Sequence, residues 1–410
     1  MGSAALLLPL VLSGLSNAAE ISVAPGGLAD ALAQSAPGDV LTLAPGVYAG
    51  PLEIARPLTL RGEAGTVIRG NGAGSVIRIA APDVTVAGLT ITGSGLSLET
   101  EDSGIFVTRD GDRAVIEGNV IVGNLIGVFL KGPDDAAVRD NRIEGQRDMH
   151  MSERGNGVQL WNSPGSVVEN NSFRFGRDGI FVGTSRDNVF RNNRFQELRF
   201  AVHYMYTNRS EVSENVSIGN HVGYAVMYSR HVEVLNNRSR GDRDHGILLN
   251  YANSSTIAGN DVSGGAHKCV FIYNANKNRF ADNRFAGCDI GVHFTAGSER
   301  NRIAGNAFIG NRTQVKYVGT RQIEWSEDGR GNHWSDHTAF DLDGDGIADR
   351  PYRPNNAVDR IVWRHPLAKL LLNSPSTQLV AWAQSAFPTL LPGGVTDSAP
   401  LMDVPGAETP

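Results

Sequence analysis

The chain has 410 residues, of which 41% are hydrophobic and 20% charged, and its formal net charge is −6 at pH 7. A mildly acidic chain offers no extended basic surface, which argues against nucleic acid as a partner. After the first residues, no stretch approaches the ~20 consecutive apolar residues that a membrane-spanning helix requires.

The N-terminus has the pattern of a secretory signal peptide. An apolar run at 4–12 precedes small residues that end at Ala18 and Ala19, and no Lys or Arg occurs before Arg56. An apolar run before a small-residue cleavage site is typical of exported proteins, so we assign residues 1–19 to a signal peptide. The alternative is that the run forms a buried first strand.

Residues 20–98 predict one helix and several short strands. Gly27 to Ser35 (GLADALAQS) has the pattern of an amphipathic helix, and alternating apolar segments follow at 40–43, 58–60 and 84–86. A helix laid over the end of a sheet would protect its unpaired edge, so we expect an N-terminal capping helix.

An asparagine recurs at nearly constant spacing through the middle of the chain. All but one of the intervals between successive copies are equal to within a single position. This short period fits one coil of a β-solenoid and is too short for a propeller blade. We interpret the asparagines as structural corner residues that hydrogen-bond along a ladder. They are Asn119, Asn141, Asn171, Asn193, Asn215, Asn237, Asn260, Asn283 and Asn306.

A glycine followed by alternating apolar residues precedes many of these asparagines by rather more than half a period. Examples lie at 104–107, 127–130 and 246–249. Strands this short cannot bury an apolar face alone, but stacked in parallel at ~4.8 Å they share one core. The sequence therefore predicts an all-β parallel solenoid over residues 20–320.

The interval from Asn141 to Asn171 is the one that is longer than the rest, which predicts an inserted loop at 146–155 (QRDMHMSERG). Loop insertions on one face of a solenoid usually serve binding. Met149, His150 and Met151 place two thioethers and an imidazole on this loop and are candidate copper ligands. A plain surface loop is the alternative.

The alternation also predicts an apolar outer face on the solenoid. A row of apolar side chains facing solvent is unusual for a monomer and indicates a binding surface. The row comprises Phe129, Phe181, His203, Met205, Met227, Leu248, Phe271, Tyr273 and His293. Candidate contacts for a protein client are Phe129, Phe181, Leu248, Phe271 and Tyr273.

Three residues of this row are candidate metal ligands. Met205 and Met227 are separated by one period, so they should stack as neighbours in adjacent coils, and His203 shares their face. Two thioethers and an imidazole suit a soft ion, copper(I) above all. The alternative is that the methionines fill gaps in a packed interface.

An enzymatic site is not evident. Asp242, Asp244 and His245 form the only suggestive trio of catalytic residue types, and they lie at a corner before a core strand. No paired-carboxylate glycosidase site is visible. The sequence therefore predicts a protein that is not an enzyme. A β-helix lyase or epimerase that modifies polysaccharides, or a polysaccharide-binding protein, is the alternative.

The two cysteines occupy different positions in their coils. Cys269 takes the glycine position, whereas Cys288 precedes the equivalent Gly291 by three positions. On adjacent flat strands this offset exceeds the ~7 Å between Cα atoms that a disulfide tolerates, so we expect free, buried thiols. A turn between the two would instead allow the disulfide that an oxidising compartment favours.

Beyond residue 320 the period ends, and residues 321–365 carry an Asp-rich segment, DLDGDGIAD. Its carboxylate spacing matches a short extracellular calcium loop, although position 12 is Tyr352 rather than glutamate. A calcium-free acidic turn is the alternative. The candidate ligands are Asp341, Asp343, Asp345, Asp349 and the carbonyl of Ile347, with Asp336 or Asp359 as an additional ligand.

Several segments resemble one known family. They include AVHYMY (201–206), GYAVMYS (223–229), DHGILLNYANSS (244–255) and RGNHWSDHTAFDLDGDGIADRPYRPNNAVDR (330–360). With these segments the chain closely resembles the NosD family, periplasmic accessory proteins for the maturation of nitrous oxide reductase. The resemblance covers nearly the whole chain from about residue 20.

The resemblance implies a right-handed parallel β-helix of the carbohydrate-binding and sugar-hydrolase type, similar to pectate lyase. It also implies a non-catalytic role in delivering copper, transiently and as copper(I), to the copper-sulfide centre of the reductase. The implied partners are nitrous oxide reductase, an ABC-type ATPase with its membrane subunit, and a copper-donating lipoprotein. Such a protein is exported to the periplasm and associates with the inner membrane through its complex.

Residues 366–410 form a tail outside the repeats. The segment 366–391 predicts two short amphipathic helices interrupted at Ser374 and Pro375. The tail could cap the solenoid or dock on the membrane subunit, and different parts could do each. The candidate docking residues are Leu379, Trp382 and Phe387.

Overall fold

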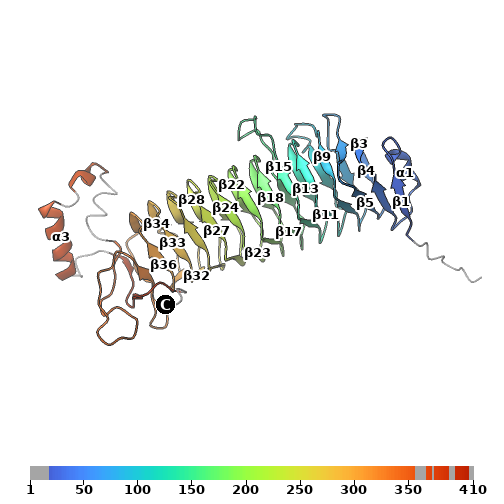
Figure 1. Ribbon diagram of the computed structural model, residues 1–410. Coiled ribbons are helices and arrows are strands. Elements are labelled where there is room, and N and C mark those ends of the chain that lie inside the picture. Colours follow the sequence, from blue (N-terminus) through green and yellow to red (C-terminus); the bar gives the residue numbers. More distant parts are fainter. Residues whose placement is uncertain (1–17, 356–365, 372–373, 387–392, 406–410) are drawn as a thin grey trace, which may run out of the picture.

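The chain winds into a long parallel solenoid built from three sheets (Figure 1). The structure, a computed structural model, describes residues 18–355, 366–371, 374–386 and 393–405. The strand pairings along all three sheets are parallel, with one strand contributed by each coil. The prediction of an all-β parallel solenoid is confirmed. The predicted signal peptide lies outside the described residues, except Ala18 and Ala19.

The first and third sheets have thirteen strands each. Sheet 1 contains β1 Glu20–Val23, β2 Val40–Leu43, β5 Thr59–Gly62, β8 Thr85–Ala87, β11 Val115–Glu117, β14 Ala137–Arg139, β17 Val167–Glu169, β20 Val189–Arg191, β23 Ser210–Ser213, β26 Val232–Leu235, β29 Thr256–Ala258, β32 Arg279–Ala281 and β35 Arg302–Ile303. Sheet 3 contains β3 Gly46–Ala49, β6 Thr66–Arg69, β9 Thr90–Thr92, β12 Val120–Val122, β15 Arg142–Glu144, β18 Ser172–Arg174, β21 Arg194–Gln196, β24 Val216–Ile218, β27 Arg238–Arg240, β30 Asp261–Ser263, β33 Arg284–Ala286, β36 Ala307–Ile309 and β39 His333–Trp334.

Sheet 2 has twelve strands, and it contains the segments in which a glycine is followed by alternating apolar residues. It contains β4 Leu52–Ile54, β7 Ile77–Ile79, β10 Ser103–Val107, β13 Ile126–Lys131, β16 Val158–Trp161, β19 Asp178–Gly183, β22 Phe200–Met205, β25 Val222–Met227, β28 His245–Asn250, β31 Lys268–Tyr273, β34 Ile290–Thr295 and β37 Thr313–Val318. From β10 onward its strands are the longest of each coil, so this sheet offers the widest outer surface.

One hydrophobic core runs inside the coils from end to end. The short strands of sheets 1 and 3 mostly bury only their central residue, as Val168 in β17 and Phe190 in β20 show. Equivalent side chains stack between coils: the rings of Phe173 and Phe195 lie 5.0 Å apart. Each coil therefore buries its inward side chains only because the next coil covers them.

The predicted asparagine ladder is confirmed. The backbone N–H of Asn119 donates to Oδ1 of Asn141 at 2.9 Å, and the same bond joins each later pair up to Asn306. The ladder continues to Asn332, whose N–H donates to Oδ2 of Asp397 at 2.7 Å. Buried amides thus satisfy one another, which supports the structural interpretation of these residues.

Asp397 is wholly buried and comes from the C-terminal segment, which returns to the end of the solenoid. There β38 (Gln322–Glu324) pairs with β40 (Gly394–Thr396). Nε1 of Trp334 also donates to Asp397, at 2.8 Å. Burial raises the pKa of the Asp397 carboxyl, and these hydrogen bonds oppose that rise. The last part of the predicted tail therefore completes the final coil.

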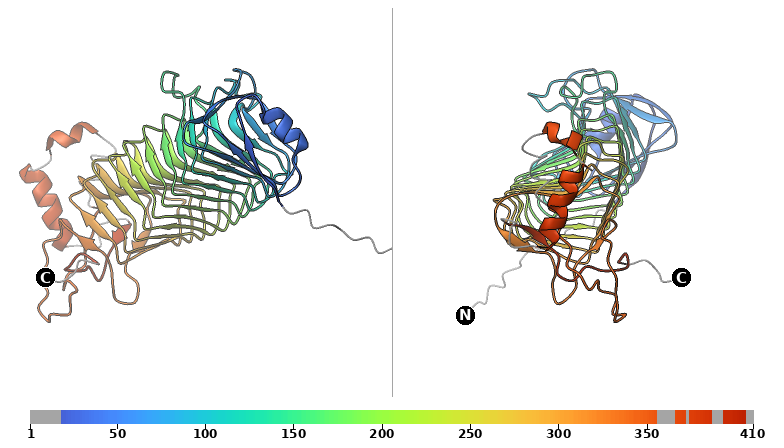
Figure 2. Two further views of the ribbon diagram at one scale, coloured as in Figure 1. Left: turned by 45° about the vertical axis from the view of Figure 1, so that its right-hand side comes forward. Right: turned by 90° about the vertical axis from the view of Figure 1, so that its left-hand side faces the viewer.

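The rest of the described tail stands apart from the coils. It consists of η1 (Pro366–Leu371) and α3 (Pro375–Ala386), which Figures 1 and 2 show beside the C-terminal end. At the other end, α1 (Leu28–Gln34) confirms the predicted helix and buries Leu28 in the core. Arg56 donates to the carbonyl oxygens at the end of α1, which have no partner within the helix.

The prediction of free cysteines is wrong: Cys269 and Cys288 form a disulfide with a Cα–Cα distance of 5.7 Å. Cys288 lies in the corner before β34, not on a flat strand. In another coil, a Cβ added at Gly104 would lie 2.9 Å from Nδ2 of Asn124, the corner residue one coil later. The corner thus brings these two positions together, and cysteines placed there can bond.

Candidate functional site

The outer face of sheet 2 brings most of the predicted site residues together. Backbone register places Met205 directly beside Met227, as predicted, and His203 beside Ala225. The row continues through Leu248, Phe271 and His293 in the next three coils. We refer to this row and its flanking residues as the outer face. It divides into two regions of different chemistry.

The first region centres on His203, which is buried (9% exposed) between the rings of Phe181 and Phe200. Its Nδ1 lies 3.1 Å from Oδ2 of Asp178, a carboxylate with no exposed surface. Arg199 donates two further hydrogen bonds to Asp178, at 2.8 and 2.7 Å. These three side chains come from two adjacent coils.

The charge state of this cluster follows from its contacts. Burial alone would raise the pKa of Asp178, but hydrogen bonds from His203 and Arg199 outweigh burial and lower the pKa of the carboxyl. An ionised Asp178 accepts a proton-bearing nitrogen, so His203 donates from Nδ1. In the neutral form of the ring, Nε2 then carries the lone pair, and this nitrogen is buried without a hydrogen-bond partner.

This arrangement has the donor chemistry that a soft cation requires. A carboxylate on one imidazole nitrogen commonly orients the other nitrogen towards a metal. The half-buried thioethers of Met205 and Met227 lie on the neighbouring row of the same face. His203, Met205 and Met227 therefore fit copper(I), whereas hard cations prefer oxygen ligands.

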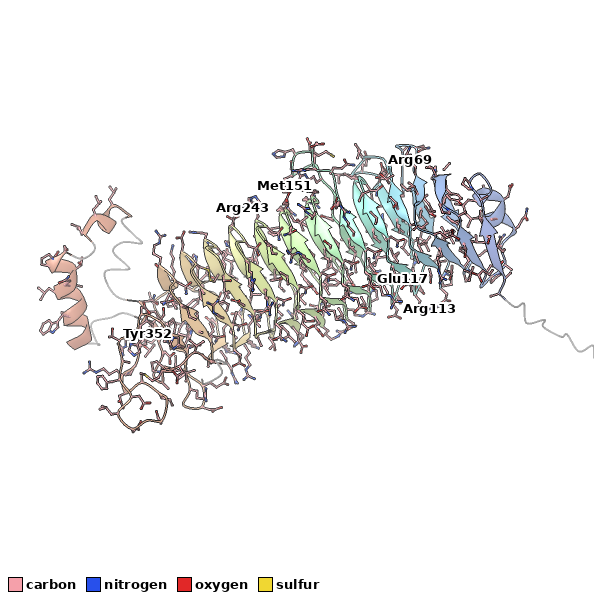
Figure 3. The ribbon with its side chains drawn as sticks, in the orientation of Figure 1. Arg69, Arg113, Glu117, Met151, Arg243 and Tyr352 are labelled. Carbon is pink, nitrogen blue, oxygen red and sulfur yellow. A yellow bond between two sulfur atoms is a disulfide. The ribbon has the colours of Figure 1, made fainter. Side chains whose placement is uncertain are left out.

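The loop at 146–155 forms as predicted, but it folds onto the outer face. Met149 packs against a small apolar cluster that includes Phe106 and Phe129. His150 is exposed and shares a 2.8 Å hydrogen bond between its Nδ1 and Ser152, and Figure 3 marks Met151 where the loop rises. Met149 and His150 therefore have different surroundings, one packed on an apolar cluster and the other exposed.

The prediction that Phe129 faces solvent on the outer face is wrong, because its side chain is only 1% exposed. Phe106 meets it edge-on at 5.3 Å, and Met149 of the inserted loop packs on this pair. The insertion supplies apolar cover that strand alternation alone does not reveal.

The second region surrounds Phe271. Its ring stacks on His293 at 4.9 Å and meets His245 at 5.4 Å, while the ammonium of Lys268 lies 4.5 Å from its centre. Burial lowers the pKa of His245. Burial, with Lys316 and Lys268 nearby, lowers the pKa of His293 to about 4. Both imidazoles are therefore neutral at pH 7.

A stack of exposed tyrosines runs beside both regions. The rings of Tyr206, Tyr228 and Tyr251 stack at 5.0 and 5.1 Å, and Tyr273 meets Tyr251 edge-on at 5.9 Å. The first three adopt left-handed backbone angles, with φ of +53°, +50° and +52°, which bulky residues rarely do. Sequence reasoning found only Tyr273, although the other three follow the same period as the asparagines.

The trio Asp242, Asp244 and His245 does not converge. Asp242 is buried in a corner, where it accepts hydrogen bonds from Asn220 and Ser239. Burial raises the pKa of Asp242. Asp244 is exposed and lies 3.5 Å from Nδ1 of His221. These contacts are structural.

The Asp-rich loop brings Asp341, Asp343 and Asp345 together, with carboxylate oxygens within 4.8 Å of one another. Asp349 instead accepts a hydrogen bond from the backbone N–H of Leu342. Asp336 accepts hydrogen bonds from Tyr352 and Gln314, and Asp359 lies outside the described residues. Three of the predicted ligands therefore form a cluster, whereas Asp349 and Asp336 make hydrogen bonds with other residues of this segment and its surroundings.

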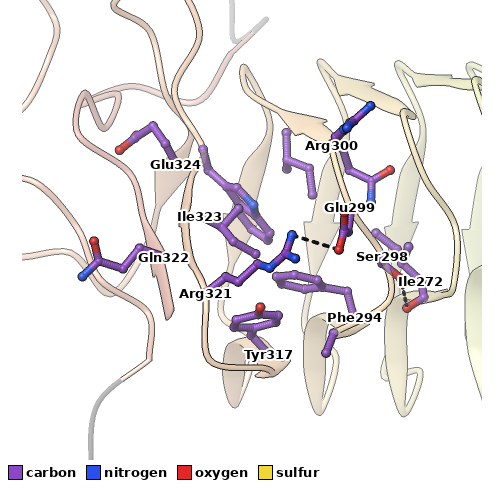
Figure 4. A pocket seen from close by; sticks show the side chains of 14 residues that line it. Ile272, Phe294, Ser298, Glu299, Arg300, Tyr317, Arg321, Gln322, Ile323 and Glu324 are labelled. Atoms are coloured by element: carbon purple, nitrogen blue, oxygen red, sulfur yellow. Dashed lines mark hydrogen bonds and ion pairs between the residues drawn. The ribbon is translucent and has the colours of Figure 1, made fainter. Parts of the chain in front are cut away.

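A cavity of about 390 Å³ lies at the C-terminal end of the solenoid. Its walls include the stacked rings of Phe294 and Tyr317, and an ion pair between Arg321 and Glu299 spans it at 2.9 Å (Figure 4). Of the predicted site residues that the structure describes, none lines this cavity.

On α3, the predicted docking residues Leu379 and Trp382 are 63% and 64% exposed. Phe387 lies outside the described residues. Among the described helices, none has the length and apolar character needed to cross a membrane.

Comparisons with known proteins agree on one family. Residues 139–339 match the model of the family described as "Periplasmic copper-binding protein (NosD)". The chain is 46% identical to the "Probable ABC transporter binding protein NosD" of Pseudomonas aeruginosa, covering 98% of this chain and 96% of that protein. It is 42% identical to the protein of the same description from Stutzerimonas stutzeri, covering 98% and 94%.

Solved structures share the fold. An exopolygalacturonase from Thermotoga maritima superposes with a TM-score of 0.56 at 11% identity, covering 73% of this chain and 91% of that one. This likeness shows a common solenoid architecture and carries no information about activity.

Proposed function

Because the chain belongs to the NosD family, we propose that it is a periplasmic accessory protein that helps to assemble the copper-sulfide centre of nitrous oxide reductase. It would act with an ABC-type ATPase and its membrane subunit, and not as an enzyme. The family is described as periplasmic and copper-binding, and the two relatives are described as probable ABC transporter binding proteins.

The observation that carries the copper proposal is the unpartnered Nε2 of His203. Asp178 holds the proton on the other nitrogen, so Nε2 offers a lone pair on the same face of sheet 2 as the thioethers of Met205 and Met227. We propose that these three residues bind copper(I) transiently. When bound, copper would be the cargo, and the protein supplies soft ligands that release it to a partner.

The test is an anaerobic titration of copper(I) against a competing chelator. Replacing His203, Met205 and Met227 by Ala, Leu and Leu should abolish binding while far-UV circular dichroism is unchanged. The matched control replaces Met149, His150 and Met151 by Leu, Ala and Leu. Unchanged copper stoichiometry in the first variant would disprove the site. Loss in the loop variant alone would move the site to the loop.

We propose that the outer face receives the reductase and that α3 contacts the membrane subunit. Phe181, Leu248, Phe271 and Tyr273 remain the candidate contacts for the client. Single truncations in an interface core can cost ≥2 kcal/mol, roughly thirtyfold in affinity. We expect Phe271→Asp to weaken capture of nitrous oxide reductase by about that factor, with the sheet 1 variant Glu233→Gln as control.

Leu379→Asp combined with Trp382→Asp should weaken binding to the membrane partners and leave client capture unchanged. Point variants are preferable to deletion from Pro375 onward, because deletion would also remove Asp397 and the last bonds of the ladder. If the double variant still co-purifies with its membrane partners at the wild-type level, α3 is not the docking element.

Further parts of the proposal concern architecture and calcium. The solenoid would be right-handed, α1 would close its N-terminal end, and a copper-donating lipoprotein would load the copper site. We also propose that Asp341, Asp343 and Asp345 hold a structural calcium ion. EDTA should then lower the melting temperature, and Asp343→Ala should remove that response. Identical melting curves with and without chelator would disprove the calcium site.

A further inference from the structure

The Phe271 region differs from the His203 region in which imidazole nitrogen is buried without a hydrogen-bond partner. Nδ1 of His245 and Nδ1 of His293 are both buried without a hydrogen-bond partner. A buried N–H without an acceptor is rarer in proteins than a buried lone pair, so the proton of each neutral ring belongs on Nε2. The edge of each ring that is not buried therefore donates a hydrogen bond.

Two ammonium groups lie on the same surface, and neither forms an ion pair within the described part of the chain. Lys268 contacts Phe271, and Lys316 pairs in register with His293 one coil later. The nearest acidic residues are engaged elsewhere: Asp244 faces His221, and Asp289 faces His267 and Arg312. Burial and Lys316 together lower the pKa of Lys268 despite the opposing effect of Asp244, and a further bound anion would also oppose that shift.

All four groups are donors. His245 and Lys268 form one row along the solenoid axis, and His293 and Lys316 form a second row three positions further along their strands. His245, Lys268, His293 and Lys316 lie on β28, β31, β34 and β37, four successive strands. Three strand spacings cover about 14 Å, which is wider than one carboxylate. An extended segment rises about 3.3 Å per residue, so carboxylates at alternate positions would fall about 7 Å apart and fill the span.

We propose that His245, Lys268, His293 and Lys316 form a receptor for an extended acidic segment of a protein partner, with carboxylates at alternate positions. The half-buried Phe271 and Leu248 would contact the apolar residues between those carboxylates. A positive surface on a chain of net charge −6 also gives the partner a defined orientation through charge complementarity.

This inference rests on the proposed function in one respect, that the outer face is a docking surface. It adds the chemical nature of the partner segment and the uptake of protons by the histidines when that segment binds. A bound carboxylate stabilises the imidazolium form, so His245 and His293 take up protons when the segment binds. The groups that face them are Lys268, Lys316, Asp244 and His267, and His245 also faces His293. Burial opposes the proton uptake most, followed by the lysines and the other histidines.

The test uses the full-length protein and two synthetic hexapeptides, one of alternating Glu and Leu and one of alternating Gln and Leu. Binding is measured by isothermal titration calorimetry at low ionic strength and pH 6.5, in buffers of different ionisation enthalpy. We expect the Glu peptide to bind at least tenfold more tightly than the Gln peptide, with net proton uptake. Lys268→Gln combined with Lys316→Gln should remove that preference, whereas Lys277→Gln should not.

Equal affinity for the two peptides, or an unchanged preference in the double lysine variant, would overturn the receptor. Zero proton uptake would overturn the proposed protonation and show that the histidines bind the segment only as neutral donors. Capture of nitrous oxide reductase distinguishes a failure of the receptor proposal from a failure of the proposed function. If Phe271→Asp weakens reductase capture but the Glu peptide shows no preference, the docking surface stands and the receptor does not.

Discussion

Two regions of one sheet use histidine in opposite ways. In the His203 region, a buried carboxylate one coil away fixes the proton on Nδ1 and leaves a lone pair for a cation. In the Phe271 region, Nδ1 of His293 has no such carboxylate among the described residues, and lysines in the adjacent coils favour an anion. Because the backbone geometry repeats, the difference arises only from side chains in the neighbouring coils. In a solenoid, therefore, the chemistry of a residue is assigned by its neighbours along the axis.

The largest effect should follow from Asp178→Asn, which breaks the first region. The side chain of Arg199 is 36% exposed, so removing Asp178 should cost about 3 kcal/mol in unfolding free energy, the lower end of the range for a buried pair. Loss of the residue that orients the ligand should also weaken copper(I) binding by about tenfold to a hundredfold. Chemical denaturation and chelator competition measure the two effects.

The matched control is Asp187→Asn. Asp187 makes the same two-pronged contact with Arg209 as Asp178 makes with Arg199, but both partners are exposed. Exposed pairs contribute about 0–1 kcal/mol. Equal losses in the two variants would show that burial does not set the strength of the His203 cluster.

The disulfide should separate the two regions thermodynamically. Cys269 and Cys288 tie β31 to the corner before β34, within the Phe271 region. Replacing both by Ala should lower the unfolding free energy by about 3 kcal/mol, the value expected for a closed loop of this size. Hydrogen exchange should quicken in β28–β37 and stay unchanged in β19–β22. Uniform acceleration along the solenoid would contradict this separation.

The pH dependence of stability should also distinguish the regions. The pKa of His293 is about 4 in the folded state, below its ordinary 6.5, so the unfolded chain binds the proton first. The contribution of His293 is therefore complete above pH 6.5 and is lost as the pH falls towards 4. Asp178 has a lowered pKa, so its contribution persists above its ordinary 3.8 and is lost only below it.

His293→Gln should flatten the melting temperature between pH 6.5 and 4 relative to wild type, and leave the fall below pH 4 in place. Differential scanning calorimetry across this range provides the measurement. A wild-type profile in the variant would show that His293 is not held neutral by its surroundings.

The smallest effect should come from Tyr228→Asn, which interrupts the tyrosine stack between the two regions. Asparagine tolerates the left-handed backbone at φ +50°, so relief of strain of about 1 kcal/mol offsets a similar loss of stacking. We expect a change in unfolding free energy below about 1 kcal/mol. A larger loss, measured by urea titration, would show that the stack itself stabilises the coils.

Periodicity allowed much of this structure to be predicted. The repeat length alone places Met205 on Met227 with no further information, and the nine asparagines mark the same corner in every coil. The partners of His203 were not predictable in this way. Asp178 and Arg199 precede the glycine or alanine position of their coils, where the strand bends and simple alternation no longer tells inside from outside.

The wrong predictions share one physical cause. Corners and inserted loops carry side chains that contact neighbouring coils, and the repeat pattern of the strands does not describe these contacts. Cys288 sits in a corner that points back towards the preceding coil, so flat-strand distances did not apply. Phe129 is covered by the loop inserted between β15 and β16 of the same coil. Asp397 lies far along the chain from its partner Asn332, and the repeat contains no pattern that predicts this contact.

The inserted loop shows that the spacing between coils does not depend on how long the connecting loops are. The coil that contains it is longer in sequence than its neighbours, yet Val128 still pairs with Val158 in unbroken register. The additional residues extend sideways and leave the rise per coil unchanged. His203 and His293 are thus separated by four strand spacings, about 19 Å, however long the loops become. The axial distance between two residues is therefore set by the number of coils between them, and a surface loop can lengthen without changing that distance.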